Sequence, residues 1–123
     1  MNVAVIGASS DRSKFGNKAV RAWHGQGHTV FPVNPRENEI EGLAVYRSVL
    51  DVPVDLGAIL VYLPPPVTIK VLPEIAKKGV GDLFLNPGAE SPEVLETARS
   101  LGLSPILACA IVAIGESPAN FSA

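Results

Sequence analysis

The opening of the chain carries the feature that most constrains its fold. Four apolar residues, 3–6, run directly into Gly7-Ala8-Ser9, and a polar loop then leads to a helical pattern that begins near Gly16. A buried-type strand, a glycine-opened loop and a helix form the first unit of α/β folds that bind nucleotides. Glycine allows a tight turn, after which the free N–H groups of the loop and of the first helical turn face one point. This opening therefore predicts a site for a phosphate-bearing ligand.

The same loop supplies positive charge for that site. Arg12 and Lys14 lie in it, together with Ser10 and Phe15. Its two glycines are separated by eight residues, a spacing that differs from the Gly-x-Gly-x-x-Gly of many dinucleotide-binding enzymes. A plain strand-to-helix turn that binds nothing is therefore the alternative interpretation of this loop.

Strands and helices alternate along the rest of the chain. The predicted strands are residues 3–6, 29–33, 43–46, 56–63, 82–85 and 105–108. The predicted helices are residues 16–26, residues 66–78 and a segment that begins after the N-cap Ser91 and ends at Gly102. Alternation of this kind implies a parallel sheet with right-handed crossovers. We therefore predict an α/β, Rossmann-like, three-layer doubly wound fold with a mainly parallel sheet of order 3-2-1-4-5-6, formed as a single domain over residues 1–123.

In such a sheet a ligand lies beyond the carboxyl ends of the strands, where the strand order reverses. The expected crevice lies between four loops, residues 7–15, 34–36, 62–66 and 86–89. An NAD site normally has an acid at the end of the second strand, but Arg36 stands there, and Glu37 follows only beyond a proline break. Arginine holds a phosphate through two parallel hydrogen bonds, which favours NADP or coenzyme A over NAD. An ordinary solvated charge is the alternative for Arg36.

Composition narrows the classes of function. The net charge of −2 and the lack of a long basic run argue against binding to nucleic acid or to an anionic membrane surface. The longest apolar run, residues 105–115, is too short to span a bilayer. The one cysteine, Cys109, excludes an internal disulfide and fits a reducing compartment. Because the chain opens on a buried-type strand rather than a signal peptide, we expect a soluble cytoplasmic protein.

No group of residues assembles into a catalytic set or a metal site. Ser9 and Ser10 would need a base, yet His24 lies on the first helix and His28 precedes the second strand. Hydroxyls that serve the turn or a phosphate are the simpler interpretation, and no ligand spacing indicates a metal. Cys109 is interpreted as a small buried apolar residue, with a mixed disulfide to a thiol ligand as the sharper alternative.

Several motifs resemble the small stand-alone CoA-binding domain proteins, which share their fold with the CoA-binding domain of the succinyl-CoA synthetase alpha subunit. The resemblance covers nearly the whole chain and rests on 5–9, 14–16 and 32–36, that is Val-Ile-Gly-Ala-Ser, Lys-Phe-Gly and Pro-Val-Asn-Pro-Arg, and on shorter matches at 40–42, 46–48 and 51–55. The chain differs from better-known members in two places: Asn86-Pro87-Gly88 replaces their Gln and Gly, and Leu107-Ala108 replaces the Asp-Arg that precedes their cysteine.

The resemblance implies that the chain binds coenzyme A or an acyl-CoA, and because no catalytic set assembles, we expect it to do so without catalysis of its own. It implies a pyrophosphate site in the first loop, an adenosine and 3′-phosphate site at residues 34–36, a wall at residues 62–66 and a pantetheine path beside residues 86–89. Cys109 matches a cysteine near the end of the family's last strand. The candidate ligand-binding residues are Gly7, Ala8, Ser9, Ser10, Arg12, Lys14, Phe15, Asn34, Pro35, Arg36, Tyr62, Leu63, Pro64, Pro65, Asn86, Pro87, Gly88 and Cys109.

Two other functions stay open on the sequence. One is an NADP-binding, oxidoreductase-like domain, although no proton donor for a nicotinamide stands out. The other is a protein-interaction module without a nucleotide, in which the apolar run 106–114 would face a partner. We expect that run to be buried instead, under the C-terminal tail or in a homodimer.

Overall fold

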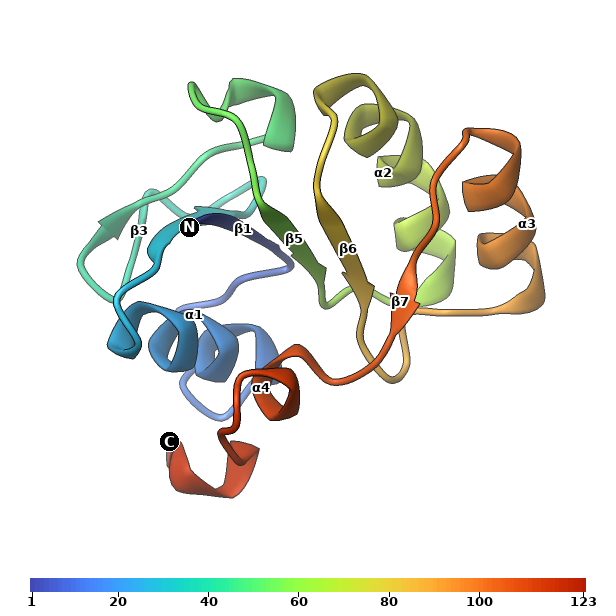
Figure 1. The fold of residues 1–123 in the computed structure, drawn as a ribbon. Helices are drawn as coiled ribbons and strands as arrows, with labels where there is room; N and C mark the ends of the chain where they lie inside the picture. The colour runs from blue at the N-terminus through green and yellow to red at the C-terminus, as the bar shows by residue number, and fades with distance from the viewer.

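A computed structural model describes residues 1–123 and shows a parallel sheet between two layers of helices (Figure 1). The sheet has five strands in the order β2-β1-β5-β6-β7, and every neighbouring pair is parallel. The strands are β1 (Asn2–Ile6), β2 (Thr29–Val33), β5 (Ala58–Val61), β6 (Asp82–Leu85) and β7 (Ile106–Leu107). The predicted α/β, Rossmann-like class is confirmed, and so is the order predicted for these five strands.

The predicted third strand, residues 43–46, is wrong as a full strand of this sheet. Its first half forms β4 (Leu43–Ala44), which pairs antiparallel with β3 (Glu39–Ile40) in a separate two-stranded sheet. Glu41 and Gly42, with φ of 50° and 76°, reverse the chain between β3 and β4, so β4 bonds back to β3 rather than extending along β2. Only Tyr46 reaches the main sheet, through a single parallel bridge to Val33. In the predicted order 3-2-1-4-5-6, the third strand is therefore represented beside β2 by Tyr46 alone.

The helices cover the two faces of the sheet in pairs. In Figure 1, α2 and α3 lie side by side on one face, and α1 lies on the other face with the short α4 beside it. The helices are α1 (Phe15–Gly25), α2 (Pro65–Lys78), α3 (Pro92–Ser100) and α4 (Ala110–Ala113), with single 3-10 turns η1 (Val49–Asp51) and η2 (Pro118–Asn120). None of the helices is both long and apolar enough to cross a lipid bilayer.

The strand β1 is buried on both faces, which is why its sequence is continuously apolar. Val3 and Val5 pack in the cluster under α1 and α4, whereas Ala4 and Ile6 pack in the cluster under α2 and α3. Successive side chains of a strand point to opposite faces, so one short strand contributes to both halves of the core. The central position of β1 thereby fixes where its carboxyl end, and the loop that follows, emerge from the sheet.

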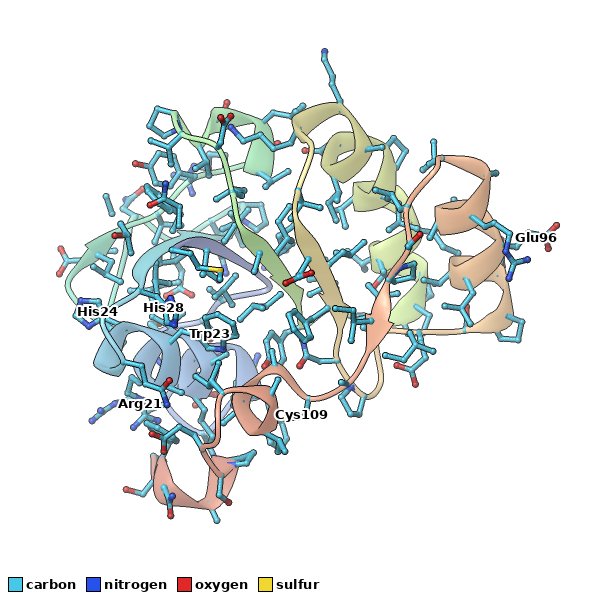
Figure 2. The ribbon with its side chains drawn as sticks, in the orientation of Figure 1. Arg21, Trp23, His24, His28, Glu96 and Cys109 are labelled. Atoms are coloured by element: carbon cyan, nitrogen blue, oxygen red, sulfur yellow. The ribbon has the colours of Figure 1, made fainter.

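The C-terminal residues 109–123 pack on α1. Ala110 and Ile111 are fully buried, and Trp23 Nε1 donates a hydrogen bond to the Ala110 carbonyl at 3.2 Å. The Arg21 guanidinium lies 5.7 Å from the ring centroid of Phe121, and Figure 2 shows Arg21 and Trp23 directed toward this segment. The apolar run 106–114 is divided, because Ala110 and Ile111 are in the core whereas Ile106, Leu107 and Val112 are exposed.

Candidate functional site

Two adjoining cavities lie at the carboxyl ends of the strands, the edge at which the sequence predicts a ligand. Their volumes are about 430 and about 490 Å³, which is the size range of small-molecule sites. Gly7, Lys14, Tyr62 and Leu63 line both, so the cavities form one crevice with two lobes. We call the smaller one the α1 lobe, since Phe15 and Gly16 of α1 line it, and the larger one the α2 lobe, since it is lined by residues of α2.

Most of the predicted site residues line this crevice. Besides the four shared residues, the α1 lobe is lined by Phe15, Pro64, Asn86, Pro87, Gly88 and Cys109. The α2 lobe is lined by Ala8, Ser9, Asn34 and Pro35. The loops named from the sequence therefore meet in space, since the carboxyl ends of parallel strands share one edge of the sheet.

Four predicted residues do not line the crevice: Ser10, Arg12, Arg36 and Pro65. Arg12 is turned away from it, because Arg12 Nε pairs with Glu41 Oε2 at 3.5 Å. The Ser10 N–H donates to the carboxylate of Glu37 at 3.0 Å. Arg36 is exposed, and Pro65 is the first residue of α2.

Sequence reasoning missed part of the α2 lobe. Arg47, Ser48 and Glu74 line it, together with Ile6, Val33, Val49, Val67 and Val71. Val67, Val71 and Glu74 recur at the spacing of one helical stripe, a signal that was available in the sequence. Nothing in the sequence distinguishes a helical stripe that faces a core from one that faces a cavity.

The junction of the two lobes depends on two glycines that allow three backbone segments to approach one another. Gly7 has a φ of 90°, and a Cβ there would overlap the Tyr62 carbonyl at the end of β5. A Cβ at Gly16 would in turn overlap the Gly7 carbonyl. The spacing of these glycines thus reflects a close contact between the first loop, the start of α1 and the β5–α2 turn.

Backbone donors gather at this junction. The N–H groups of Ala8, Ser9, Phe15 and Gly16 form no hydrogen bond within the protein. The carbonyls of Ala8 and Ser9 are both held, by the side-chain amides of Asn34 and Asn17, each at 2.9 Å. With the carbonyls held and the N–H groups free, the loop and the first turn of α1 form a concentration of positive partial charge, to which the ammonium group of Lys14 adds a full charge.

The tip of the loop is held by its own hydrogen bonds. Asp11 Oδ1 accepts from the Ser13 hydroxyl at 2.6 Å and from the Ser13 N–H at 3.0 Å. These two bonds lower the pKa of the Asp11 carboxyl, with desolvation opposing them and Lys14 adding to them. The Lys14 N–H then donates to the Asp11 carbonyl at 3.1 Å, immediately before α1 begins. The loop therefore reaches α1 in a defined conformation.

Tyr62 places a buried hydroxyl at the crevice. Its Oη has no hydrogen-bond partner within the protein, and Tyr62 lines both lobes. Burial raises the pKa of the Tyr62 phenol above its usual range, and the nearby Cys109 thiol adds to this effect. Tyr62 is therefore a protonated donor that no protein atom satisfies, which is rare for a buried polar group.

The end of β2 carries an acid as well as bases. The turn after Asn34 brings Glu37 back to the first loop, where its Oε2 accepts from the Ser10 N–H and lies 3.4 Å from Asn34 Nδ2. Besides Lys14, the base that lines the α2 lobe is Arg47, whose guanidinium donates to the Glu37 carbonyl at 3.2 Å. Although Glu37 follows Pro35 in the sequence, its side chain thus contacts the first loop.

Known proteins share both the sequence and the fold of this chain. A sequence profile described as a CoA binding domain matches residues 1–115. The chain is 39% identical over 88 residues to the acetate–CoA ligase (ADP-forming) of Methanocaldococcus jannaschii, covering 71% of this chain and 12% of that protein. It is 32% identical over 132 residues to the alpha subunit of acetate–CoA ligase (ADP-forming) II of Pyrococcus furiosus, covering 98% of this chain and 29% of that protein.

The chain spans less than a third of the length of these two curated relatives. Among solved structures, a conserved hypothetical protein from Pyrococcus furiosus superimposes with a TM-score of 0.83 at 36% identity, covering 91% of this chain and 97% of that one. The fold of this chain therefore occurs both as a part of longer ligases and as nearly the whole of a short chain.

Proposed function

The chain belongs to the CoA-binding domain family, and on that premise we propose that it binds coenzyme A or an acyl-CoA in the two-lobed crevice, without catalysis of its own. The observation that carries the proposal is the junction of the lobes, where free backbone N–H groups, the start of α1 and Lys14 converge. A pyrophosphate matches this arrangement, because its charge would meet several donors and the positive end of a helix at once.

The two lobes suit the two ends of such a ligand. The α2 lobe adjoins the end of β2 at Asn34 and Pro35, the usual side for adenosine in this fold. Arg47 lines this lobe whereas Arg36 is exposed outside it, so we expect Arg47 to contact the 3′-phosphate more closely than Arg36 does. The α1 lobe would then take the pantetheine arm, with Cys109 in its wall.

Binding without catalysis is supported by what the polar groups of the crevice already do. The hydroxyls of Ser9 and Ser48 accept backbone N–H groups two residues further along the chain, at 3.0 and 3.1 Å. His24 and His28 do not line the crevice, and Figure 2 shows both on the side of α1, away from Cys109. No serine of the crevice therefore has a histidine base beside it. In the longer ligases named above, we infer that the equivalent domain holds CoA while other parts of the protein perform the chemistry.

Calorimetric titration of ligand-free protein with CoA, dephospho-CoA, NADP and NAD tests this function. We expect CoA to bind most tightly and the loss of the 3′-phosphate to weaken binding. Lys14→Gln should weaken CoA binding about tenfold, since it removes one charge-assisted contact to a phosphate. The matched control is Lys70→Gln, because Lys70 is an exposed lysine of α2 outside the crevice.

Binding of NADP without CoA would replace this proposal with an oxidoreductase-like function. The absence of heat with all four ligands would favour an interaction module without a nucleotide. Equal losses in the two lysine variants would place the phosphates away from the junction.

A further inference from the structure

An acid lines the α2 lobe of a crevice that we propose takes an anionic ligand. Glu74 Oε1 accepts a hydrogen bond from the Ser48 hydroxyl, and Ser48 Oγ accepts the Leu50 N–H at 3.1 Å. Glu74 Oε2 forms no hydrogen bond within the protein, and no cation pairs with the carboxylate. One oxygen of Glu74 is therefore fixed by the protein and the other is free to meet a ligand.

Glu74 lies at the end of the lobe that is furthest from the phosphate junction. Val67, Val71 and Glu74 form one stripe of α2 that lines the lobe. At 1.5 Å per residue, Glu74 lies about 10 Å along the helix axis from Val67, which is near the start of α2 beside the junction. Val33 and Val49 also line the lobe. The lobe is thus walled in part by valines, and Arg47, Ser48 and the Glu74 carboxylate also line it.

An acid in this position selects the part of the ligand that it can contact. A carboxylate repels the phosphates of the ligand, but it can accept a hydrogen bond from a base that carries a donor group. The valines of the lobe favour contact with a flat ring. We propose that Glu74, fixed by Ser48, accepts a hydrogen bond from the exocyclic amino group of adenine and so makes the crevice selective for adenine nucleotides. This inference rests on the proposed function and assigns the base specificity of the same crevice.

The test compares coenzyme A with its deaminated analogue, in which hypoxanthine replaces adenine and a carbonyl replaces the amino group. Wild-type protein should bind CoA at least about tenfold more tightly than the analogue, because a hydrogen bond to a charged group is lost and two acceptors meet. In Glu74→Gln the amide oxygen keeps the bond from Ser48 and presents an NH₂ group to the base. We expect the preference for adenine to vanish or to reverse in this variant.

The matched control is Glu96→Gln, because Glu96 is an exposed acid on α3 that Figure 2 shows on the outer side of the molecule. It should keep the full preference for CoA. If Glu74→Gln does not fold, Ser48→Ala takes its place, since it frees the carboxylate and should reduce the preference several-fold.

Two results would overturn the inference while leaving the proposed function intact. One is wild-type protein that binds CoA and its deaminated analogue equally. The other is a folded Glu74→Gln or Ser48→Ala variant that keeps the full preference. Wild-type protein that binds neither compound would instead remove the proposed function and this inference together.

Discussion

Replacement of Tyr62 by phenylalanine should stabilise the unliganded protein and at the same time weaken its affinity for CoA. The hydroxyl is buried without a partner, so in the folded chain it has lost its hydration and gained no hydrogen bond. An unsatisfied buried group of this kind costs about 1–3 kcal/mol. Its removal leaves a void of one atom, which offsets part of that gain. We expect Tyr62→Phe to raise the free energy of unfolding by about 1 kcal/mol, equivalent to about 4 °C in Tm.

The pH dependence gives a second, independent measure of the same hydroxyl. Because burial raises the pKa of Tyr62 in the folded protein, the phenol ionises more readily in the unfolded chain. The unfolded state then binds fewer protons than the folded state once the pH passes the ordinary tyrosine pKa of about 10. Wild-type stability should fall above that pH, by up to about 1.4 kcal/mol per unit, until the pH reaches the folded pKa. Tyr62→Phe should lack this component.

Urea unfolding followed by circular dichroism, repeated between pH 7 and pH 11, measures both quantities. The difference between wild type and Tyr62→Phe isolates the one phenol, since every other titrating group is common to both. Tyr46→Phe is the control, because Tyr46 is the other tyrosine and does not line the crevice. Titration of the same variants with CoA gives the affinities. We expect the bound ligand to bring an acceptor to this unpaired hydroxyl, so Tyr62→Phe should lose about five- to tenfold in affinity.

If Tyr62→Phe destabilises the unliganded protein by about 1 kcal/mol or more, the hydroxyl has a partner in solution, contrary to this prediction. Stabilities of wild type and Tyr62→Phe that stay parallel above pH 10 would likewise show that the Tyr62 pKa is not raised by burial. A loss of CoA affinity without any gain in stability would mean that water or another group satisfies the hydroxyl in the free protein.

Two further predictions concern the frame of the phosphate junction. Gly16→Ala should destabilise the protein by about 2–4 kcal/mol in thermal unfolding, since its Cβ would overlap the Gly7 carbonyl. The control is Gly25→Ala on the same helix, which should be neutral or slightly stabilising because a Cβ there has nothing within 4 Å. Asn17→Ala should lower the free energy of unfolding by about 2–3 kcal/mol and weaken CoA binding. The reason is that fully buried Asn17 forms three side-chain hydrogen bonds, one of which holds the Ser9 carbonyl. Unchanged CoA affinity would mean that the amide does not position the loop.

The sequence predicted the strands well because burial on both faces makes a parallel strand continuously apolar, as in β1. It failed at residues 43–46 because the turn at Glu41 and Gly42 requires a left-handed conformation that glutamate rarely adopts. The first loop could be predicted as a strand-to-helix connection, since a strand, a glycine and a helix start are all local signals. The Glu37 contact to the Ser10 N–H and the Ser48 bond to Glu74 join segments distant along the chain, which no local pattern reports.

The distribution of charge along the crevice gives a reason why a CoA-type ligand would bind in one direction only. Lys14 and the free N–H groups lie at the junction, whereas Arg47, Glu74 and a wall of valines line the α2 lobe. With the pyrophosphate held at the junction, a reversed ligand would place its pantetheine arm in the α2 lobe, so Arg47 would lose the 3′-phosphate and Glu74 would lose the adenine amino group. Loss of one hydrogen bond to a charged group costs about 1.5–3 kcal/mol, which corresponds to a loss of about ten- to a hundredfold in affinity. Glu74→Gln should therefore relax the direction of binding as well as the choice of base, and a crystal structure of the variant with CoA would show whether the adenine still occupies the α2 lobe.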